Sequence, residues 1–483
     1  MEVLKDILFG VNLKSIQGDR DMEITGVAFD SRLVKKGNLF VAVKGITTDG
    51  HSFISNAIGS GASAVLCQTL PTKLDGDVAF VETENSARAL GVCASNFYGR
   101  PSDKLKLIGI TGTNGKTTIV TLLHDLFSKL GYKSGLLSTV ENRIGHKISD
   151  STHTTPDTIQ LNKLLSQMVE EGCTHCFMEV SSHALIQDRT EGLAFSGGVF
   201  TNISHDHLDY HKTFDEYIAA KKLLFDNLPS TAFALVNQDD KRGKIMLQNT
   251  KADKQKFAIK SMADFKAKVI HSTLQGLELD VDGTDVWFKL VGGFNAYNLL
   301  TVYAIAVLLE EDKLEILEVL SSLVAARGRF EQVTNSDEII AILDYAHTPD
   351  ALENVLKTIA DVRTKNEQMI TVVGCGGNRD KSKRPKMAKI AAEYSDKVIL
   401  TSDNPRDEEP QDILNDMLVG VPKSLERNTM VIADRREAIR TACNLVNAKD
   451  IVLVAGKGHE TYQEIKGVRH HFDDKEILTE MLN

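Results

Sequence analysis

Apolar and polar positions follow each other along this chain in the rhythm of an α/β protein. Short apolar runs, typical of buried strands, are separated by stretches in which apolar residues recur every three or four positions, as in helices. The run 105–110 predicts one such strand, and a helix is predicted after it that ends near Gly131. The apolar face of this helix consists of Ile119, Leu122, Leu123, Leu126 and Leu130.

The same rhythm predicts three segments: 1–101, 102–326 and 327–483. We expect an α/β protein of three domains, in which a smaller N-terminal α/β domain precedes a central P-loop-type open sheet and a C-terminal Rossmann-like open sheet. Trp287 is expected in the core of the central segment. The predicted strands are 24–29, 39–43 and 64–67, then 105–110, 176–180 and 199–203, and finally 339–343, 369–373, 397–400 and 451–454.

A glycine-rich turn joins the strand 105–110 to the helix that follows it. Its sequence is Thr111-Gly112-Thr113-Asn114-Gly115-Lys116-Thr117-Thr118. Glycines let backbone N–H groups approach phosphate oxygens, the helix N-terminus adds positive potential, and Lys-Thr supplies a cation and a hydroxyl ligand for Mg²⁺. The common motif has glycine where this chain has Ile110, so the loop is shorter. A plain turn would explain the glycines but not Lys-Thr-Thr, so we interpret the turn as a nucleotide-phosphate site.

Polar side chains follow the next two strands of the central segment. Glu179 ends one apolar run, where it could ligate Mg²⁺ or simply form a cap or an ion pair. The stretch 204–211 follows the other strand and is dense in histidine and aspartate, which favours a site over a solvated loop. Further on, 292–298 opens a long helix through Leu309, and its asparagines could be plain N-caps. In the first segment, Asp30-Ser31-Arg32 could be a capped turn or a binding site for an anionic ligand.

Each strand of the third segment is followed by a polar or glycine-rich stretch. These stretches begin at Asp344, Gly374, Thr401 and Ala455. Since the carboxyl ends of parallel strands meet at one edge of an open sheet, we expect one site there. The glycines at 374–377 lack the third glycine of a dinucleotide fingerprint. A carboxylate or phosphate ligand is indicated instead by the basic residues Arg379, Lys381, Lys383, Arg384 and Arg406.

Composition excludes several classes of protein. The chain has 483 residues, 42% hydrophobic and 25% charged, with a net charge of −10. This argues against a general nucleic-acid or membrane surface, and no apolar stretch approaches the length of a membrane span. We expect a cytoplasmic protein, because six cysteines at irregular spacing suit a reducing compartment, and we also expect a monomer. The pair Cys173 and Cys176 has no second pair, and we interpret it as apolar filling rather than a metal or redox site.

Taken together and in order, these motifs resemble those of the Mur ligases, the ATP-dependent amide-bond-forming enzymes of peptidoglycan precursor synthesis. The resemblance covers nearly the full chain. The segments that carry it are 111–118, 179–183, 206–209, Phe294-Asn295-x-x-Asn298, 328–331 and 344–349. Within the family, Asp403-Asn404-Pro405-Arg406 and Gly456-x-Gly458-His459-Glu460 are similar to the member that adds 2,6-diaminopimelate to UDP-N-acetylmuramoyl-L-alanyl-D-glutamate.

The resemblance implies a reaction and a set of residues. ATP would phosphorylate the D-glutamyl carboxylate, and the amine of the amino acid would attack the acyl phosphate. The catalytic residues implied are Lys116, Glu179, His207 and Lys221. The ATP site would use Gly112, Thr113, Asn114, Gly115, Lys116, Thr117, Thr118, Asn295, Arg329 and Asp344. Mg²⁺ would be held by Thr117, Glu179, His207 and a carbamylated Lys221, with Lys222 as the alternative lysine. The UDP-substrate would be bound by Ser31, Thr47, Thr154, Thr155, Ser181, Gln187 and Arg189.

The amino-acid site has its own physical argument. meso-Diaminopimelate differs from lysine by a second carboxylate, which Arg406 could bind in bidentate fashion while Asp403 or Glu460 takes an amine. The site would consist of Arg379, Asp403, Asn404, Pro405, Arg406, Gly456 and Glu460. We therefore predict diaminopimelate rather than L-lysine. The chain could also be a folylpolyglutamate synthetase, which the first segment disfavours, or a non-catalytic nucleotide-binding relative.

Overall fold

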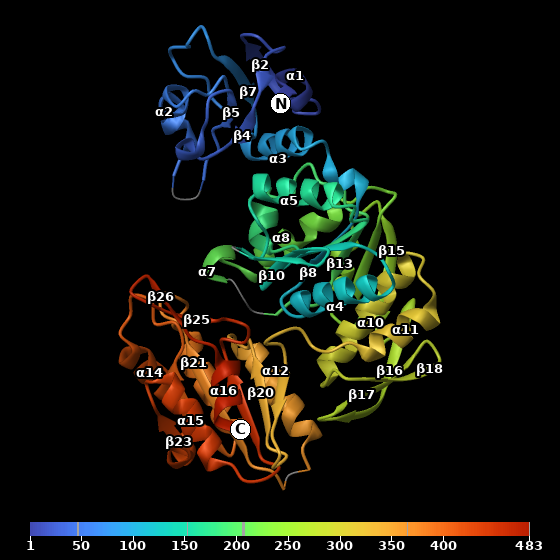
Figure 1. Ribbon diagram of the computed structural model, residues 1–483, viewed down its shortest axis with the longest axis vertical. Helices are drawn as coiled ribbons and strands as arrows, with labels where there is room; N and C mark the ends of the chain where they lie inside the picture. The colour runs from blue at the N-terminus through green and yellow to red at the C-terminus, as the bar shows by residue number, and fades with distance from the viewer. Residues whose placement is uncertain (46–47, 152, 205–207, 365, 483) are drawn as a thin grey trace. The chain divides into compact units, whose positions relative to one another are not determined.

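The computed structural model describes residues 1–45, 48–151, 153–204, 208–364 and 366–482 (Figure 1). These residues form two compact units. The first contains 1–112, 123–200 and 215–256, and the second contains 113–122, 201–214 and 257–483, apart from the residues outside the description. No helix among the described residues is long and apolar enough to cross a membrane.

The N-terminal part of the first unit is a five-stranded sheet with helices beside it. The strand order is β2 (Leu13–Gln17), β7 (Ala79–Thr83), β6 (Ala64–Cys67), β5 (Asn38–Val41) and β4 (Gly26–Ala28). Leu39 and Val41 pack into one apolar cluster while Phe40 packs into another, so β5 is buried on both faces, as expected for parallel strands. The expected strand 24–29 is split, because β3 (Glu23–Ile24) pairs with β1 (Glu2–Val3) instead. The helices are α1 (Leu4–Ile7), α2 (Ile54–Gly59) and α3 (Ser86–Phe97).

The rest of the first unit contains the predicted central sheet. Its strands run in the order β11 (Lys147–Asp150), β10 (Glu141–Ile144), β9 (Ser134–Leu137), β12 (His175–Glu179), β8 (Lys106–Thr111), β13 (Gly197–Phe200), β14 (Phe233–Asn237) and β15 (Asp253–Ala258). β8 lies between β12 and β13, parallel to both, so the carboxyl ends of these three strands lie at one edge. Helices of this region are α5 (Thr158–Glu170), α6 (Ser182–Ile186), α8 (Phe214–Asp226) and α9 (Gly243–Met246). Helix α4 (Lys116–Lys129) begins in the second unit and continues into the first from residue 123.

The second unit begins with an antiparallel sheet. Its strands are β16 (Phe265–Thr273), β17 (Gly276–Val281) and β18 (Thr284–Phe288), and they are followed by α10 (Gly293–Leu308) and α11 (Lys313–Ser322). The expectation of a buried Trp287 is wrong, because 43% of this residue is exposed. Trp287 lies on β18, the last strand of the sheet, where residues alternate between the two faces and Trp287 pairs with Glu278.

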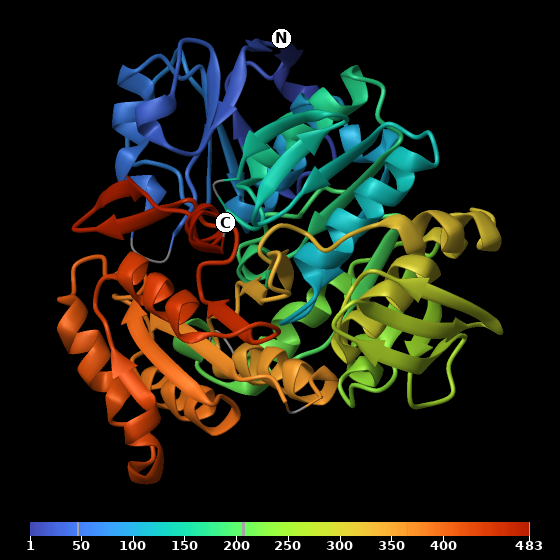
Figure 2. The same ribbon diagram turned by 60° about the horizontal axis from the view of Figure 1, so that its bottom comes forward.

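The C-terminal part of the second unit is the predicted open sheet. Its order is β19 (Glu331–Thr334), β20 (Ile340–Asp344), β24 (Ile451–Ala455), β21 (Met369–Cys375), β22 (Lys397–Ser402) and β23 (Thr429–Val431), and all neighbours except β19 and β20 are parallel. Figure 2 shows this sheet in orange to red. Its helices are α12 (Pro349–Val362), α13 (Lys383–Tyr394), α14 (Pro410–Leu418), α15 (Arg435–Leu445) and α16 (Asp474–Leu482), and a separate hairpin consists of β25 (Tyr462–Ile465) and β26 (Val468–His471).

A fully buried ion pair ties the ends of two of these strands to the C-terminal helix. Arg435 and Asp474 are both at 0% side-chain exposure, and their charged groups lie 2.7 Å apart. The Arg435 guanidinium also donates to the carbonyl oxygens of Ala455, at 3.1 Å, and Ser402, at 3.5 Å. Ser402 and Ala455 are the last residues of β22 and β24, so this pair fixes the two strand ends after which the predicted amino-acid site begins.

Replacing Arg435 with methionine is expected to lower the free energy of unfolding by about 3–5 kcal/mol, because Asp474 would keep a buried charge without its partner. Arg436→Met is the matched control, since the neighbouring Arg436–Glu480 pair is 46% and 59% exposed and should change stability by less than about 1 kcal/mol. Urea unfolding followed by circular dichroism measures both variants. Equal losses would contradict a special role of the buried pair.

Candidate active site

The phosphate loop has the backbone shape that its glycines predict. In the second unit, Gly115 has a φ of +91°, a conformation that side chains rarely adopt, and a Cβ there would lie 2.6 Å from Oδ1 of Asn298. The Thr113 N–H donates to the Asn202 carbonyl oxygen and the Asn114 N–H to Oδ1 of Asn202, both at 2.9 Å. Asn202 therefore holds the middle of the loop through two consecutive amides.

Lys116 and Thr117 begin α4, and both have contacts that suit a phosphate site. The Lys116 ammonium donates to the Thr113 carbonyl oxygen at 3.0 Å, so it turns back over the loop. Arg329 donates to the Thr117 hydroxyl at 3.1 Å and lies over the Tyr345 ring, 4.8 Å from its centre. Among the described residues, the buried Nε of Arg329 has no hydrogen-bond partner. Arg329 thus has donor capacity left for an anionic ligand.

Asp344 ends β20, next to Arg329 in the second unit. Burial raises the pKa of Asp344 to about 6, although Arg329 and the backbone amides of Phe330 and Ala346 counteract this. The Phe330 N–H donates to the carboxylate at 2.8 Å, and Phe330 has a φ of +52°.

Asn295 and Asn298 belong to the first turns of α10, but neither is its N-cap. Instead, Asn298 donates to Oδ1 of Asn295, and Asn295 donates back to the Val291 carbonyl oxygen, both at 2.8 Å.

In the first unit, Glu179 is a buried carboxylate at the end of β12. It is 1% exposed and accepts hydrogen bonds from the Thr139 backbone N–H at 2.8 Å and from the Thr139 hydroxyl at 3.1 Å. The Thr139 hydroxyl also lies 3.0 Å from the hydroxyl of Thr154. Glu179 is therefore held by a neighbouring loop.

Three further residues predicted to bind the UDP-substrate are joined to the backbone of Glu179 through Thr155, which is itself a fourth. The Thr155 hydroxyl donates to the Glu179 carbonyl oxygen at 2.9 Å and accepts from the Ser181 N–H at 3.0 Å. Arg189 donates to the Thr155 carbonyl oxygen at 2.8 Å and to Gln187 at 2.6 Å. The structure thus brings Thr154, Thr155, Ser181, Gln187 and Arg189 into one hydrogen-bond network with Glu179.

The two neighbouring lysines of α8 differ sharply in their surroundings. Lys221 is 2% exposed, lies 4.4 Å from the centre of the Tyr217 ring and donates to the Gly112 carbonyl oxygen at 3.0 Å. Lys222 forms an ion pair with Asp226, one turn further along α8, at 2.5 Å. Lys222 is thus paired within its own helix, whereas Lys221 contacts the backbone just after the end of β8.

The predicted amino-acid residues gather at the carboxyl ends of β22 and β24. Asn404 donates to Glu460 at 2.7 Å, and the ammonium of Lys457 lies 3.1 Å from both Asn404 and Glu460. The Lys457 ammonium is also 3.7 Å from the Asp403 carboxylate. Gly456 has a φ of +114°, and a Cβ there would lie 2.8 Å from Asp403, so glycine is required beside this carboxylate. The structure brings Asp403, Asn404, Gly456 and Glu460 into contact around Lys457.

Arg406 borders this cluster, and the five predicted basic residues have different surroundings. Arg406 donates to the Gly377 carbonyl oxygen at 2.8 Å and lies 3.6 Å from Glu464, with a φ of +53°. Arg384 is fully buried and paired with Glu408 and Asp416, and Lys381 also pairs with Glu408. Lys383 donates to the His347 carbonyl oxygen. Arg384 thus serves the fold, because acidic residues of the next loop and helix neutralise it, whereas the side chain of Lys381 is 68% exposed. Arg379 is exposed, and Pro405 is buried between Asn404 and Arg406.

Other predicted residues lie apart from these networks or outside the described residues. Ser31 lies in a 3-10 helix capped by Asp30, whose carboxylate pairs with Arg32 at 2.6 Å. The stretch thus forms a capped turn, and its binding of an anionic ligand stays a prediction. Thr47 and His207 lie outside the described residues. Cys173 and Cys176 are buried and free, and burial raises the pKa of both thiols, as expected for apolar filling.

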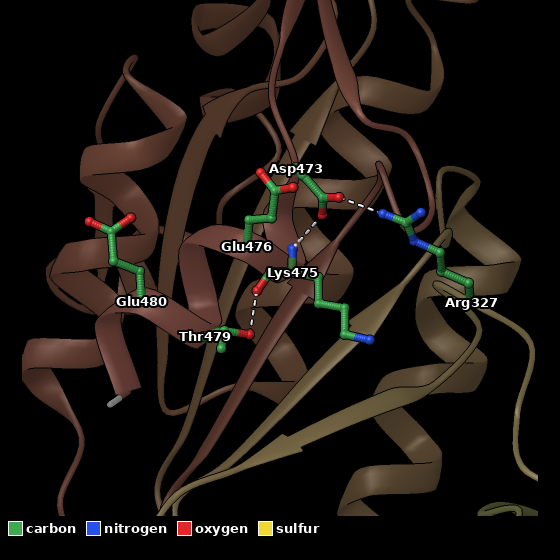
Figure 3. Close-up of a pocket in the computed structure, with 6 residues that line it drawn as sticks. All are labelled: Arg327, Asp473, Lys475, Glu476, Thr479 and Glu480. Atoms are coloured by element: carbon green, nitrogen blue, oxygen red, sulfur yellow. Dashed lines mark hydrogen bonds and ion pairs between the residues drawn. The ribbon is translucent and has the colours of Figure 1, made fainter.

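A pocket of about 640 Å³ at the start of α16 contains none of the predicted residues (Figure 3). Its lining consists of Arg327, Asp473, Lys475, Glu476, Thr479 and Glu480, and in Figure 3 Arg327 points toward Asp473. In the described part of the chain, no group of three or more His, Cys, Asp or Glu residues could hold a metal ion. The candidate site therefore consists of the residues at the carboxyl ends of the strands and not of this pocket.

Sequence reasoning missed two supporting residues. Thr139 holds the Glu179 carboxylate, and Lys457 holds Glu460. Lys457 lies between two predicted motif glycines, so its position could have drawn attention to it. Thr139 follows β9 and carries no motif signal.

Family models match the chain in three successive stretches. The Mur ligase family catalytic domain matches residues 23–98, the Mur ligase middle domain matches 110–306, and the Mur ligase glutamate ligase domain matches 328–458. The chain belongs to the Mur ligase family. This confirms the predicted family, its three-domain α/β fold and its ligase class. The predicted boundaries after residues 101 and 326 stay a prediction.

Some proteins of this family are similar to the chain over nearly its full length. The chain is 60% identical to a UDP-N-acetylmuramoyl-L-alanyl-D-glutamate–2,6-diaminopimelate ligase from Cytophaga hutchinsonii and 54% identical to one from Phocaeicola vulgatus, with 99% of each chain covered in both comparisons. A solved structure of a ligase with the same name is 31% identical, has a TM-score of 0.71, and is matched over 100% of this chain and 98% of its own.

Gly115→Ala is expected to weaken nucleotide binding at least about 10-fold, because the new methyl group would displace Asn298 or distort the loop. Gly131→Ala is the matched control. Gly131 has nearly the same φ, +92°, but no atom would lie within 4 Å of a Cβ at this position, so this variant carries backbone strain without a clash. It should lose about 1 kcal/mol of stability and keep its affinity. Calorimetric titration with Mg·ATP measures both, and equal affinities would contradict the role of Gly115.

Proposed function

We propose that this protein is the ATP-dependent ligase that joins meso-2,6-diaminopimelate to UDP-N-acetylmuramoyl-L-alanyl-D-glutamate. The observation that carries the proposal is the cluster at the ends of β22 and β24, where carboxylates that suit an ammonium group lie beside Arg406, which suits a carboxylate. The two relatives with 60% and 54% identity are named for this activity, and the match covers 99% of each chain. The step belongs to the synthesis of peptidoglycan precursors.

The reaction has two bond-forming steps. An oxygen of the D-glutamyl carboxylate attacks the γ-phosphorus of ATP, and the bond to ADP breaks, which gives an acyl phosphate. The unprotonated amine of diaminopimelate then attacks the acyl carbon through a tetrahedral intermediate. Inorganic phosphate leaves as the amide forms, and the amine proton passes to solvent or to phosphate. Such chemistry needs alignment and charge neutralisation more than a protein nucleophile.

ATP is assigned to the glycine-rich loop and the residues that approach it in the second unit. Lys116 and the amides of Gly115 and Thr118 would bind phosphate oxygens. Gly112, Thr113 and Asn114 are proposed to shape the loop around the phosphates, because Asn202 already accepts from the amides of Thr113 and Asn114. Arg329 supports this assignment, because its buried Nε has no partner among the described residues. Asn295 and Asp344 are proposed to contact the rest of the nucleotide.

Mg²⁺ fits the oxygen donors that the chain offers. Glu179 is a buried carboxylate that accepts from the uncharged amide and hydroxyl of Thr139, and Thr117 offers a hydroxyl. When bound, Mg²⁺ would neutralise phosphate charge. A second ion is proposed at His207 and Lys221, where carbamylation would convert the Lys221 amine into an anion. The burial of Lys221 and the ion pair of Lys222 favour Lys221 for this role.

The UDP-substrate is assigned to the network around Thr155, with Ser31 and Thr47 as further contacts from the N-terminal segment. Arg189 lies on that network, where it can stabilise an anionic part of the substrate. A monomeric state and the absence of nucleic-acid partners stay predictions.

Selectivity for diaminopimelate over lysine is proposed to come from Arg406, with Arg379 as a second cation. If lysine were bound, its far end would bring no carboxylate to Arg406, which would keep only its ion pair with Glu464 at 3.6 Å. Such a mismatch costs a few kcal/mol, which corresponds to discrimination on the order of 10³.

The test is turnover with UDP-N-acetylmuramoyl-L-alanyl-D-glutamate, Mg·ATP and either meso-diaminopimelate or L-lysine, read as phosphate release and product mass. We expect a tripeptide product with diaminopimelate only, and phosphate release that requires all three substrates. Arg406→Ala should reduce the preference for diaminopimelate by about 100-fold or more, because the bidentate partner is lost.

The control for that variant is Arg440→Ala, which removes a surface arginine that is 54% exposed on α15 and should leave the preference unchanged. Turnover with lysine but not with diaminopimelate would contradict the assignment of the amino acid, although the protein would still be a ligase. If Arg406→Ala kept the same preference for diaminopimelate over lysine, the proposed role of Arg406 would be wrong.

Lys221→Met is expected to abolish turnover, because the anionic carbamate could not form, whereas Lys222→Met should keep most of the activity. After incubation of the protein with ¹³C-bicarbonate, a carbamate signal in the NMR spectrum should appear in the parent and in Lys222→Met. It should be missing in Lys221→Met. A signal that survives in Lys221→Met, or an active Lys221→Met variant, would overturn the carbamate assignment.

A further inference from the structure

Lys457 is a buried cation that none of the predicted binding motifs explains. Its side chain is at 0% exposure, and its ammonium lies 3.1 Å from Oε2 of Glu460, 3.1 Å from Oδ1 of Asn404 and 3.7 Å from Oδ1 of Asp403. A lysine is rarely buried in this way without a charge to balance. Here it lies between two carboxylates that both belong to the candidate amino-acid site.

The contacts of Lys457 determine how Glu460 is oriented. Oε2 of Glu460 accepts from both Lys457 and Asn404, while Oε1 lies 3.4 Å from the Tyr345 hydroxyl. Asn404 cannot turn away, because its Oδ1 accepts from Lys457 and from the Glu464 N–H, at 2.9 Å. One carboxylate oxygen is thus committed to the protein, and Oε1 keeps acceptor capacity for a ligand.

The charges of the cluster sum to a net value that suits an ammonium ligand. Asp403 and Glu460 contribute two negative charges and Lys457 one positive charge, while the charge of Arg435 is cancelled by Asp474. One negative charge is left over in a largely buried environment. A single ammonium group of an amino acid would complete the balance.

We propose that Lys457 is a positioning residue for the amino-acid substrate: its ammonium balances the carboxylates of Asp403 and Glu460 and turns Glu460 so that Oε1 accepts an ammonium group of the incoming diamino acid. The proposal rests on the proposed function, since it adds a residue to that site. Lys457 acts through Glu460 and is not assigned a contact with the substrate.

The protonation of Glu460 follows from the groups around it. Burial and Asp403 raise the pKa of Glu460, whereas Lys457 and the Asn404 amide lower it. Burial also disfavours the charge of Asp403, but Lys457 and Arg435 outweigh this and hold its pKa below the usual range. Other ionisable groups near Glu460 are Tyr345, which directly follows β20, Arg435 from α15 and Tyr462 from β25. His347 and Lys383 also act on the Asp403 carboxylate. Without Lys457, the pKa of Glu460 rises further, and Glu460 becomes protonated and neutral in a larger fraction of molecules near neutral pH.

The test compares the parent with Lys457→Met, which keeps a similar volume and removes the charge. We expect KM for diaminopimelate to rise about 30-fold or more, with kcat and KM for ATP changed less than about 3-fold. Relative to the parent, kcat/KM of the variant for the amino acid should rise with pH, because alkali ionises Glu460. Asp403→Asn added to Lys457→Met should recover part of the loss, since it removes the competing negative charge.

Lys389→Met is the control, because Lys389 is an exposed lysine, 59% accessible on α13, and should leave all constants unchanged. If Lys457→Met does not fold, Lys457→Gln replaces it with the same expectation, since glutamine keeps a donor but has no charge. A loss confined to kcat, or a pH profile parallel to that of the parent, would overturn the proposal. A parent that is inactive with every amino acid would overturn the proposed function itself, and a parent that uses lysine leaves the Lys457 test in place with lysine as substrate.

Discussion

A carboxylate at the end of a buried parallel strand needs a donor or a cation beside it, and the candidate site depends on this constraint. Glu179 is held by the backbone and hydroxyl of Thr139, Asp344 by the Phe330 amide and Asp403 by Lys457. Each carboxylate is thereby fixed in one orientation in a poorly hydrated place. Fixed charges of this kind can bind metal ions, cations or ammonium groups with little reorganisation.

The start of α16 connects two regions of the second unit that the reaction would use. Asp473 pairs with Arg327, two residues before Arg329, while Asp474 pairs with Arg435 under the ends of β22 and β24. Lys475 adds an ion pair with Glu331 at 2.6 Å. Three consecutive residues thus fix both the segment that carries Arg329 and the strand ends that carry the amino-acid cluster. This arrangement gives the C-terminal helix a part in placing the site, although none of its residues belongs to a binding motif.

Much of the fold and the motif residues could be predicted from the sequence, because apolar runs and glycine-rich strand ends are local signals. The strands that end in Asp344, Cys375, Ser402 and Ala455 are parallel neighbours, as the pattern predicted. What could not be predicted is compensation between distant residues. Arg384 has the sequence context of a ligand-binding cation, but Glu408 and Asp416 neutralise it, and Trp287 is exposed because its strand's position in the sheet is not encoded locally. The contacts of Lys457 with Asn404 and Asp403 could not be predicted for the same reason, although Glu460 lies only three residues away.

The central claim is that the substrate carboxylate is activated by phosphorylation before the amide forms. The most direct measurement uses UDP-N-acetylmuramoyl-L-alanyl-D-glutamate labelled with ¹⁸O in the D-glutamyl carboxylate, turned over with Mg·ATP and diaminopimelate. An acyl phosphate requires one carboxylate oxygen to leave with phosphorus, so the mass spectrum of the released inorganic phosphate should show one ¹⁸O atom for each amide formed. Release of unlabelled phosphate together with amide formation would contradict the account.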